Sequence, residues 1–522
     1  MVQSNLAMHG PYPKFADDAF VRLLRHTPEI PAKMGYACLP AYAGLDSKLN
    51  GYSIDDVQQR VALVAEIAAQ HRRYDRALLS QAEQLTWDVF DFFLRYTPFE
   101  PWIGVAGADF ALHPYPVRHF GGAPAETFNL LVNMHEVRAE RDAESYLARL
   151  ALLDRVCRDL ADGLAHRESS GIAPPRVALQ IVHREIGTLL TAGAQCSELV
   201  TSFATKLKHS GIDRARAQGF LADAQRMAEG LFAGGLLKLR DTIAQLEARS
   251  DDRLGVWRLP RGDEYYRYML GRETSTSMSP DEIFELGTQE VARLHAELAR
   301  DVAALGFGGA DLRAALAAAL KIDGATNREE ILDHYRRLVD DTAIRIRPSF
   351  GRFPRGHCIV RATPSHLEQR RTSTYYPPAV DGAYPGAFEV CLARETGKAP
   401  WARHQLAYHE AYPGHHLQLT IAQELEHLPL MRRSFIVAAF LEGWAKYAER
   451  LPFEAGVDTD ARYELSRKAY ELISASNLML DVGIHQRRWS REQAVEFSFD
   501  RALVDRPMAE YLVDRLEWNV LI

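Results

Sequence analysis

The chain has 522 residues, of which 47% are hydrophobic and 25% charged, a composition typical of a folded globular protein with a large core. Its formal net charge is −7, from 62 basic and 69 acidic residues, and it has no long basic run, so no nucleic-acid partner is expected. No stretch approaches the roughly 20 apolar residues that a membrane helix needs, so we expect no membrane partner.

The N-terminal segment and the cysteines predict a cytoplasmic location. The first residues lack both the continuous apolar stretch and the small-residue cleavage pattern of a signal peptide. The five cysteines are scattered and odd in number, so we expect reduced thiols at Cys38, Cys157, Cys196, Cys358 and Cys391. The oligomeric state is not predictable from these features.

Helical patterns fill the N-terminal half of the chain. Ser53 provides a capping signal ahead of an apolar stripe that begins at Val57 and continues with Val61 and Val64. Longer periodic segments predict helices within 141–168, 175–206 and 213–248. We expect residues 1–278 to form the walls of a cleft.

The second half, residues 279–522, is expected to carry the chemistry, within one interlocked unit. A capping box at Ser279-Pro280-Asp281-Glu282 predicts a helix start. The predicted buried face of this helix consists of Ile283, Leu286, Val291, Leu294 and Leu298. Residues 345–400 are rich in Gly, Pro, Arg and Tyr and contain two β-like runs, 357–361 and 388–392. The sequence therefore predicts a mainly α, multi-helical fold with a small β-sheet.

The most distinctive motif is His-Glu-Ala-Tyr-Pro-Gly-His-His at 409–416. Zinc prefers imidazole and carboxylate ligands, and a catalytic site keeps three of them and leaves the fourth position to water. The common helical zinc signature places its second His four residues after the first. Here that position is Pro413, followed by Gly414, so a bulge or kink is predicted between the ligands.

Two second ligands are compatible with this spacing. In an unbroken helix His416 returns to the face of His409 two turns later, whereas a bulge that absorbs two residues brings His415 into the four-spaced position. We expect one of the two to bind zinc and the other to lie behind it. Glu410 is placed to take a proton from the zinc-bound water.

A carboxylate on a second helix is the expected third ligand. Glu442 lies in an apolar helical run that begins near Arg433, where a buried acidic group needs a partner such as a metal. The adjacent Gly443 costs the helix about 1 kcal/mol relative to Ala, which suggests close approach of another element. Glu449 is the alternative carboxylate, although its position before Arg450 is more typical of a solvated helix end.

These motifs resemble an uncharacterised bacterial family of metallopeptidase-like proteins with the His-Glu-x-x-Pro-Gly-His-His signature, grouped with zinc peptidases whose third ligand is glutamate. Further similar segments are SPDEIFELG at 279–287, YYPPAVDG at 375–382, EGWAKYAE at 442–449 and DVGIHQRRW at 481–489. The resemblance covers most of the chain. It implies a zinc-peptidase-like fold and one Zn²⁺ held by His409, one or both of His415 and His416, and Glu442, with Glu410 as base.

Members of that family continue past the equivalent of Trp518 into a segment that carries a tyrosine. Related zinc peptidases use such a donor for the oxyanion, and its loss can cost about 100-fold in rate. The 522 residues lack this segment, which predicts a truncated form, a natural variant that uses another donor, or a weakened enzyme. The candidate donors are His485, Tyr376 and Tyr511.

Substrate contacts are predicted in two places. Asp481 and His485 share a helix face, and Arg487 and Arg488 follow at a helix end, where substrate groups commonly bind. An ordinary helix end, with cations at the negative end of the dipole, is the alternative.

The second place is the 388–394 run, which includes Glu389. It is our candidate for an edge strand that binds an extended peptide. Tyr375 and Tyr376 are expected to line the same cleft, with plain packing of the turn as the alternative.

The sequence thus predicts a zinc-dependent hydrolase that cleaves amide bonds in short peptides. A zinc enzyme that acts on a small non-peptide amide or a biosynthetic intermediate would keep every ligand and differ only in its pocket. A catalytically weakened metal-binding protein is the third possibility, because of the tyrosine that is lacking.

Overall fold

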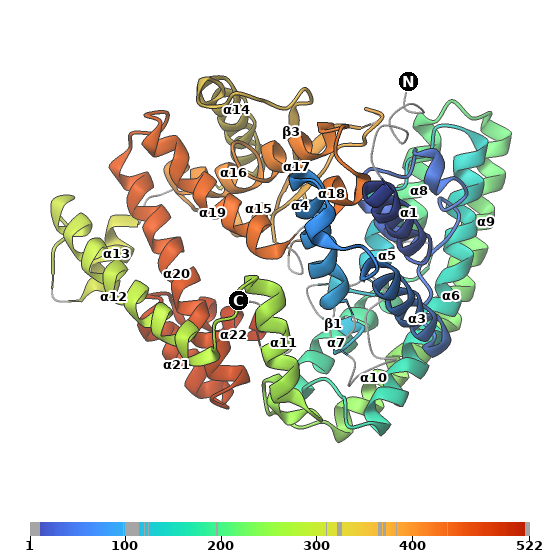
Figure 1. The fold of residues 1–522 in the computed structure, drawn as a ribbon, viewed down its shortest axis with the longest axis horizontal. Coiled ribbons are helices and arrows are strands. Elements are labelled where there is room, and N and C mark those ends of the chain that lie inside the picture. The colour runs from blue at the N-terminus through green and yellow to red at the C-terminus, as the bar shows by residue number, and fades with distance from the viewer. Residues whose placement is uncertain are drawn as a thin grey trace. The chain divides into compact units, whose positions relative to one another are not determined.

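The computed structural model is mainly helical, with two small sheets, as the sequence predicts (Figure 1). It describes residues 11–97, 99, 114–118, 121–123, 125–194, 197–309, 311–320, 326–363, 368, 372–382, 384–435 and 437–516. Cys196 lies outside the described residues, and Cys38, Cys157, Cys358 and Cys391 form no disulfide with one another. No helix among the described residues is long and apolar enough to cross a membrane.

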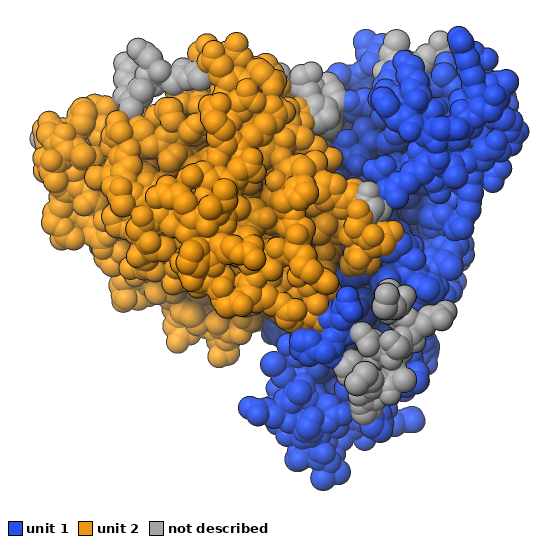
Figure 2. Space-filling view, turned by 90° about the horizontal axis from the view of Figure 1, so that it is seen from above, with its two compact units in different colours: residues 1–252, 426–435 blue, residues 253–425, 436–522 orange. Residues whose placement is uncertain are grey.

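The chain divides into two compact units, coloured separately in Figure 2. Unit 1 comprises residues 1–252 and 426–435, and unit 2 comprises residues 253–425 and 436–522. All the residues predicted to bind metal or substrate belong to unit 2. The expected division after residue 278 stays a prediction.

Unit 1 is built from helices and one two-stranded hairpin. Its longer helices are α1 (Pro11–Arg25), α3 (Ile54–His71), α4 (Gln81–Arg95), α6 (Glu140–Ser169), α7 (Arg176–Ala192), α8 (Glu198–His209), α9 (Arg214–Ala233) and α10 (Gly235–Arg249). The shorter elements are α2 (Glu29–Lys33), β1 (Val117–Arg118), β2 (Gly121–Gly122), α5 (Ala125–Asn129) and α18 (Leu430–Ser434).

Local capping signals in unit 1 act as predicted, but long periodic segments are subdivided. Ser53 and Asp56 form a reciprocal capping box at the start of α3. The 213–248 segment is two helices, separated at Gly234, because the Gly235 amide donates to the Asp154 carboxylate at 2.5 Å. A Cβ at Gly234 would lie 2.5 Å from the same carboxylate, so the close approach requires glycine there.

Unit 2 contains the other helices and a three-stranded sheet. Its helices are α11 (Gly262–Thr274), α12 (Pro280–Ala304), α13 (Leu312–Leu320), α14 (Arg328–Ile346), α15 (Leu392–Glu395), α16 (His404–Glu410), α17 (His415–Glu424), α19 (Ala438–Glu454), α20 (Ala461–His485), α21 (Arg491–Arg501) and α22 (Arg506–Leu516). Its strands are β3 (Cys358–Ala362), β4 (Thr374–Tyr376) and β5 (Gly386–Val390).

Helix α12 begins where its capping box predicts, with Ser279 as the cap and Pro280 in the first turn. Four of the five residues predicted for its buried face are buried, but Leu286 is 41% exposed. The face is set by the packing of α12 against α20, where Gly287 lies close to Met479. Because Gly287 makes this close contact, the stripe passes through it and leaves Leu286 outside.

The sheet has the order β3-β5-β4, which corrects one prediction. β5 pairs in parallel with β3 and antiparallel with β4, so both of its edges are used. Every residue of β5 is buried. The 388–394 run, with Glu389, is therefore not an edge strand that could add a peptide, because its backbone groups already bond to two neighbours. The outer strands are β3 and β4.

The start of β5 makes a close contact with α17. A Cβ at Gly386 would lie 2.5 Å from the Tyr375 hydroxyl and 2.7 Å from Nδ1 of His416. Neither partner can withdraw, because the hydroxyl and Nδ1 are hydrogen-bonded to each other at 2.9 Å. Gly443, by contrast, has no described atom within 4 Å of an added Cβ, so the predicted close approach of another element at this glycine is wrong.

We predict opposite effects of alanine at these two glycines. Gly386→Ala forces the Tyr375–His416 pair apart and lowers the free energy of unfolding by about 1–3 kcal/mol. Gly443→Ala reduces the backbone freedom of the unfolded chain and raises the free energy of unfolding by about 0.4–1 kcal/mol. Urea unfolding followed by circular dichroism measures both. An unchanged midpoint for Gly386→Ala would contradict the tight contact.

Candidate metal centre

The predicted kink between the first and second histidines is a complete break in the helix. α16 ends at Glu410, residues 411–414 form a turn, and α17 begins at His415. Gly414 sits against the end of α16, where a Cβ would lie 1.8 Å from the carbonyl oxygen of His409. Only glycine fits there, so the chain can reverse tightly and start a second helix beside the first.

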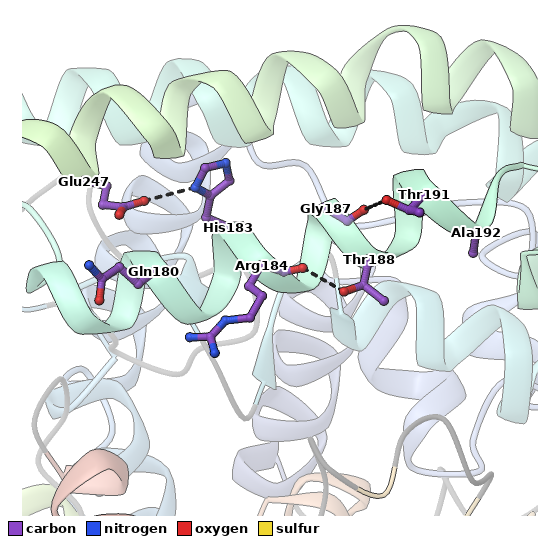
Figure 3. A pocket seen from close by; sticks show the side chains of 8 residues that line it. All are labelled: Gln180, His183, Arg184, Gly187, Thr188, Thr191, Ala192 and Glu247. Atoms are coloured by element: carbon purple, nitrogen blue, oxygen red, sulfur yellow. Dashed lines mark hydrogen bonds and ion pairs between the residues drawn. The ribbon is translucent and has the colours of Figure 1, made fainter.

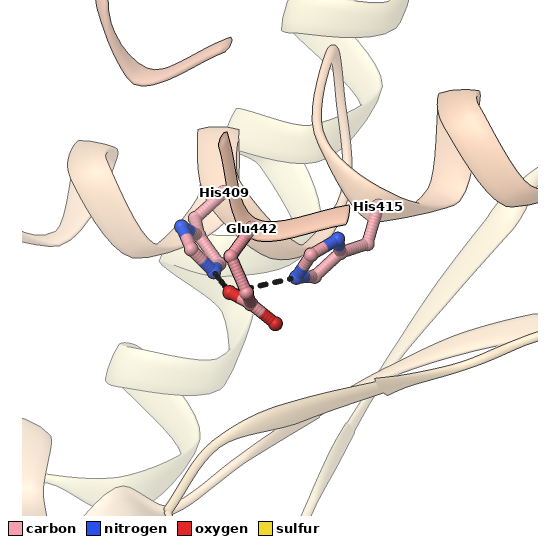
Figure 4. A group of neighbouring side chains, drawn as sticks. All are labelled: His409, His415 and Glu442. Carbon is pink, nitrogen blue, oxygen red and sulfur yellow. Dashed lines mark ion pairs between the residues drawn. The ribbon is translucent and has the colours of Figure 1, made fainter. Parts of the chain in front are cut away.

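This turn brings His415, and not His416, together with His409 and Glu442. The ligating atoms of the three side chains all lie within 4.8 Å of one another, and Figure 4 shows them converging. Oε2 of Glu442 is 3.5 Å from Nε2 of His409 and 3.8 Å from Nε2 of His415. The two imidazole rings stand nearly perpendicular, at 83°, with centroids 4.7 Å apart.

This donor set fits a zinc ion. With zinc–ligand distances of about 2.0–2.1 Å, a tetrahedral site places neighbouring ligand atoms about 3.3–3.4 Å apart. The two measured separations from Glu442 exceed that by only a few tenths of an ångström. The side chain of Glu442 is 59% exposed, so the candidate third ligand faces solvent.

His409 lies between two carboxylates, Glu442 on its Nε2 side and Glu449 on its Nδ1 side. Burial alone would lower the pKa of this imidazole, but hydrogen bonds to Glu442 and Glu449 and the charge of Glu410 raise it to about 10. A proton held this firmly marks a place where the local potential favours a cation.

Glu449 is a supporting residue that the sequence analysis misjudged. Its side chain is 1% exposed, and Oε1 accepts from Nδ1 of His409 at 2.9 Å. Lys446 donates to both of its oxygens at 2.9 Å, and the Tyr463 hydroxyl donates to its backbone carbonyl. A carboxylate in this position fixes the tautomer and orientation of a ligating histidine. Glu449 follows Glu442 by seven residues, or two helix turns, and this spacing is the sequence feature that could have predicted its supporting role.

His416 supports the motif through hydrogen bonds to Tyr375 and Gly356, away from the three converging side chains. It is fully buried, its Nδ1 lies 2.9 Å from the Tyr375 hydroxyl, and its Nε2 lies 3.1 Å from the carbonyl of Gly356. Because a carbonyl only accepts, Nε2 carries the proton and Nδ1 accepts from Tyr375. Burial lowers the pKa of His416 to about 4, so it stays neutral. Both of its nitrogens are therefore in use, and Tyr375 is a packing residue.

Glu410 is buried beside the three candidate ligands. Burial raises its pKa to about 7, the charge of His409 opposes this, and the charge of Glu442 adds to it. The backbone N–H of Tyr375 on β4 donates to its carboxylate and lowers the pKa. A carboxylate with a pKa near neutrality suits a general base.

His485 is not available for catalysis in this structure. It is 0% exposed, its Nδ1 accepts from the backbone amide of Val256 at 3.1 Å, and its Nε2 donates to the carbonyl of Leu516 at 2.9 Å. Its helix partner Asp481 accepts from the Tyr266 hydroxyl at 2.8 Å, and Oδ2 of Asp481 lies 3.9 Å from Nε2 of His485. Sequence spacing identified the shared helix face correctly, but tertiary packing turned that face into the core.

The two arginines that follow are packed on aromatic rings. Arg487 lies 3.4 Å from the ring centre of Phe284 and donates to Asp281 at 3.1 Å. Arg488 lies 5.1 Å from the ring centre of Trp257. These contacts attach the end of α20 to α12 and to Trp257. They are packing contacts, as expected of an ordinary helix end.

The remaining predicted residues differ in their surroundings. The Glu389 carboxylate, 2% exposed, accepts from Arg361 at 3.1 Å within the sheet. Tyr376, on β4, packs its ring against the guanidinium of Arg361. It directly follows Tyr375, whose backbone amide contacts Glu410. Tyr511 is on α22, one turn before Arg515. Burial would raise the pKa of Glu442, but His409 and His415, with a smaller effect from the charge of Arg515, lower it.

A hollow elsewhere on the chain offers no comparable chemistry. It lies along α7 and α10 in unit 1, lined by Gln180, His183, Arg184, Gly187, Thr188, Thr191, Ala192 and Glu247 (Figure 3). His183 is paired with Glu247 at 3.0 Å. Within the part of the chain that the structure describes, His409, His415 and Glu442 form the only group of three or more His, Cys, Asp or Glu side chains close enough to share an ion.

Fold and site together define a mainly helical protein with a candidate metal centre at a helix break. The chain belongs to a family described as bacterial protein of unknown function (DUF885), whose model matches residues 28–517. No protein with a curated description matches it.

Two solved structures share the fold. One, "the putative lipoprotein from Colwellia psychrerythraea", is 22% identical, with a TM-score of 0.90 over 97% of this chain and 89% of that one. The other, "a putative lipoprotein of unknown function from Shewanella oneidensis", is 17% identical, with a TM-score of 0.67 over 98% and 90%.

These matches correct the family assignment made from the motifs. The matching family has no described activity, and the two solved neighbours are described as lipoproteins and not as zinc peptidases. The assignment to a metallopeptidase-like family is therefore wrong. Short motifs indicate which side chains lie close together in the fold, whereas membership of a family is shown by a match over most of the chain.

We predict that the two adjacent histidines separate metal binding from folding. His415→Ala removes a ligand and lowers zinc affinity by at least about 100-fold, since one of three protein ligands is lost. His416→Ala leaves the ligands in place but loses its hydrogen bonds to Tyr375 and Gly356, so the melting temperature falls. Zinc titration with a competing chelator measures the affinity. Loss of zinc in His416→Ala at an unchanged fold would contradict this assignment.

Proposed function

We propose that the protein is a zinc-dependent hydrolase of amide bonds, with one Zn²⁺ held by His409, His415 and Glu442. The observation that carries the proposal is the convergence of these three side chains, with Glu442 facing solvent. The donor types are those that a catalytic zinc site uses, and the two separations from Glu442 come within a few tenths of an ångström of its geometry. When bound, zinc would acidify a water molecule and polarise the substrate carbonyl.

Glu410 would act as the general base. Its carboxylate lies beside the ligands, is buried, and has its pKa raised to about 7, so it can take a proton near neutral pH and return it to the leaving amine. The Tyr375 amide holds this carboxylate from the side of β4. The base is therefore positioned by the sheet and the ligands by the helices.

Two tyrosines are the remaining candidates for the oxyanion donor. Tyr511 stands on the helix whose Arg515 acts on Glu442, and Tyr376 stands next to the backbone contact with Glu410. His485 is excluded because both of its nitrogens bond to the backbone.

The substrate class that we favour is a short peptide. A metal ion held by His409, His415 and Glu442, with Glu410 as base, suits hydrolysis of an amide carbonyl, the bond of a peptide backbone. The cytoplasmic location and the small non-peptide amide remain predictions from the sequence alone.

The test combines metal content with one substitution. Protein purified with zinc is expected to hold one equivalent and to cleave members of a peptide library. Glu410→Gln should keep the metal and lose about 10²–10⁴-fold in kcat, because the base is removed without touching a ligand. Zinc at 100 times its Kd should also stabilise the fold by about 2.7 kcal/mol.

Each outcome discriminates between the alternatives. Less than about a tenth of an equivalent of zinc, with no thermal stabilisation, would overturn the proposal. Bound zinc with cleavage of non-peptide amides alone would indicate the small-amide enzyme. Bound zinc without any turnover would indicate a metal-binding protein.

A further inference from the structure

The two histidine ligands of the candidate centre are supported unequally. Nδ1 of His409 bonds to Glu449, so its outward nitrogen Nε2 is fixed for the metal. Nδ1 of His415 is buried and has no aligned hydrogen-bond partner among the described atoms. A ligating histidine nearly always donates its other ring N–H to a protein group or water. The structure therefore leaves one supporting contact of the centre unassigned.

Gln418 is the side chain placed to make that contact. It lies three residues after His415, so both stand on one face of the first turn of α17. Its Nε2 donates to the carbonyl of Phe440 at 3.1 Å, and its Oε1 is buried without an aligned partner. The orientation of the amide is not arbitrary, because the Phe440 carbonyl can only accept and so must face the NH₂ end.

The two unpaired atoms are complementary. Oε1 of Gln418 is an acceptor, and Nδ1 of His415 becomes a donor once Nε2 binds a metal, since neutral imidazole carries one proton. The two residues lie three apart on α17, a spacing at which side chains on one helix face are neighbours.

We propose that Gln418 is a positioning residue for the metal centre: its Oε1 accepts the Nδ1 proton of His415 and so presents Nε2 to the metal. This inference rests on the proposed function. The same amide reaches Phe440, two residues before Glu442 on α19. One side chain thereby sets the tautomer of one ligand and holds the helix that carries the other.

Gln423 provides a matched control on the same helix. Its Nε2 donates to the carbonyl of Pro378 at 3.3 Å, so it also joins α17 to another segment, but it lies eight residues from His415. Substituting either glutamine by methionine keeps the length of the side chain and removes its hydrogen bonds. Only Gln418 should affect the metal.

The experiment measures zinc affinity by chelator competition, and the visible absorption spectrum of the Co²⁺-substituted protein, in four proteins. These are the wild type, Gln418→Met, Gln418→Glu and Gln423→Met. Gln418→Met should bind zinc about 10–100-fold more weakly, the usual cost of losing such a support, and should alter the Co²⁺ spectrum. Gln418→Glu keeps an acceptor for Nδ1 and loses the donor to Phe440, so it should retain the wild-type affinity or exceed it. Gln423→Met should match the wild type.

The outcomes separate this inference from the proposed function. Zinc binding in Gln418→Met equal to that of the wild type overturns the positioning role and leaves the metal centre standing. Equal losses in Gln418→Met, Gln418→Glu and Gln423→Met also overturn it, because they indicate a general loosening of α17. A wild-type protein that binds neither Zn²⁺ nor Co²⁺ overturns both.

Discussion

The tight approach of Gly414 to the end of α16 is the constraint on which the candidate site depends. Because no Cβ is present, the turn at 411–414 can fold back on the His409 carbonyl and start α17 immediately. The turn sets the angle between two short helices, and that angle places His415 beside His409 while His416 faces the sheet. A larger residue would push the helices apart and separate the ligands. Backbone sterics, and not helical periodicity, thus decide which imidazole joins the centre.

Buried carboxylates hold the ligand-bearing helix in place from the opposite side. His404 and Tyr408 on α16 both bond to Asp458, at 2.6 and 3.0 Å, and His409 bonds to Glu449. Such acidic groups are costly to bury alone, and here each is matched by hydrogen-bond donors. Together these hydrogen bonds anchor α16, the helix that carries His409 and Glu410, and a precise metal site requires ligands held in this way.

Features set by a few neighbouring residues were predictable from the sequence. The capping signals at Ser53 and Ser279 begin helices where expected, since their hydrogen bonds close within four residues. Features set by distant contacts were not. Three features depend on which element packs against the residues concerned. They are the exposure of Leu286, the central position of β5 in its sheet, and the burial of Glu449 and His485. The family assignment failed for a related reason, because a motif describes one place in the fold.

The sequence by itself determined the chemistry available: a His-Glu pair, a Pro-Gly break, two further histidines and a carboxylate on a later helix, within a mainly α fold. These follow from residue identity and short spacing. The tertiary structure alone decided that His415 and Glu442 converge on His409, that His416 on α17 bonds to Tyr375 of the sheet, and that His485 belongs to the core. Each of these depends on distances between segments far apart in the chain, which local periodicity does not encode.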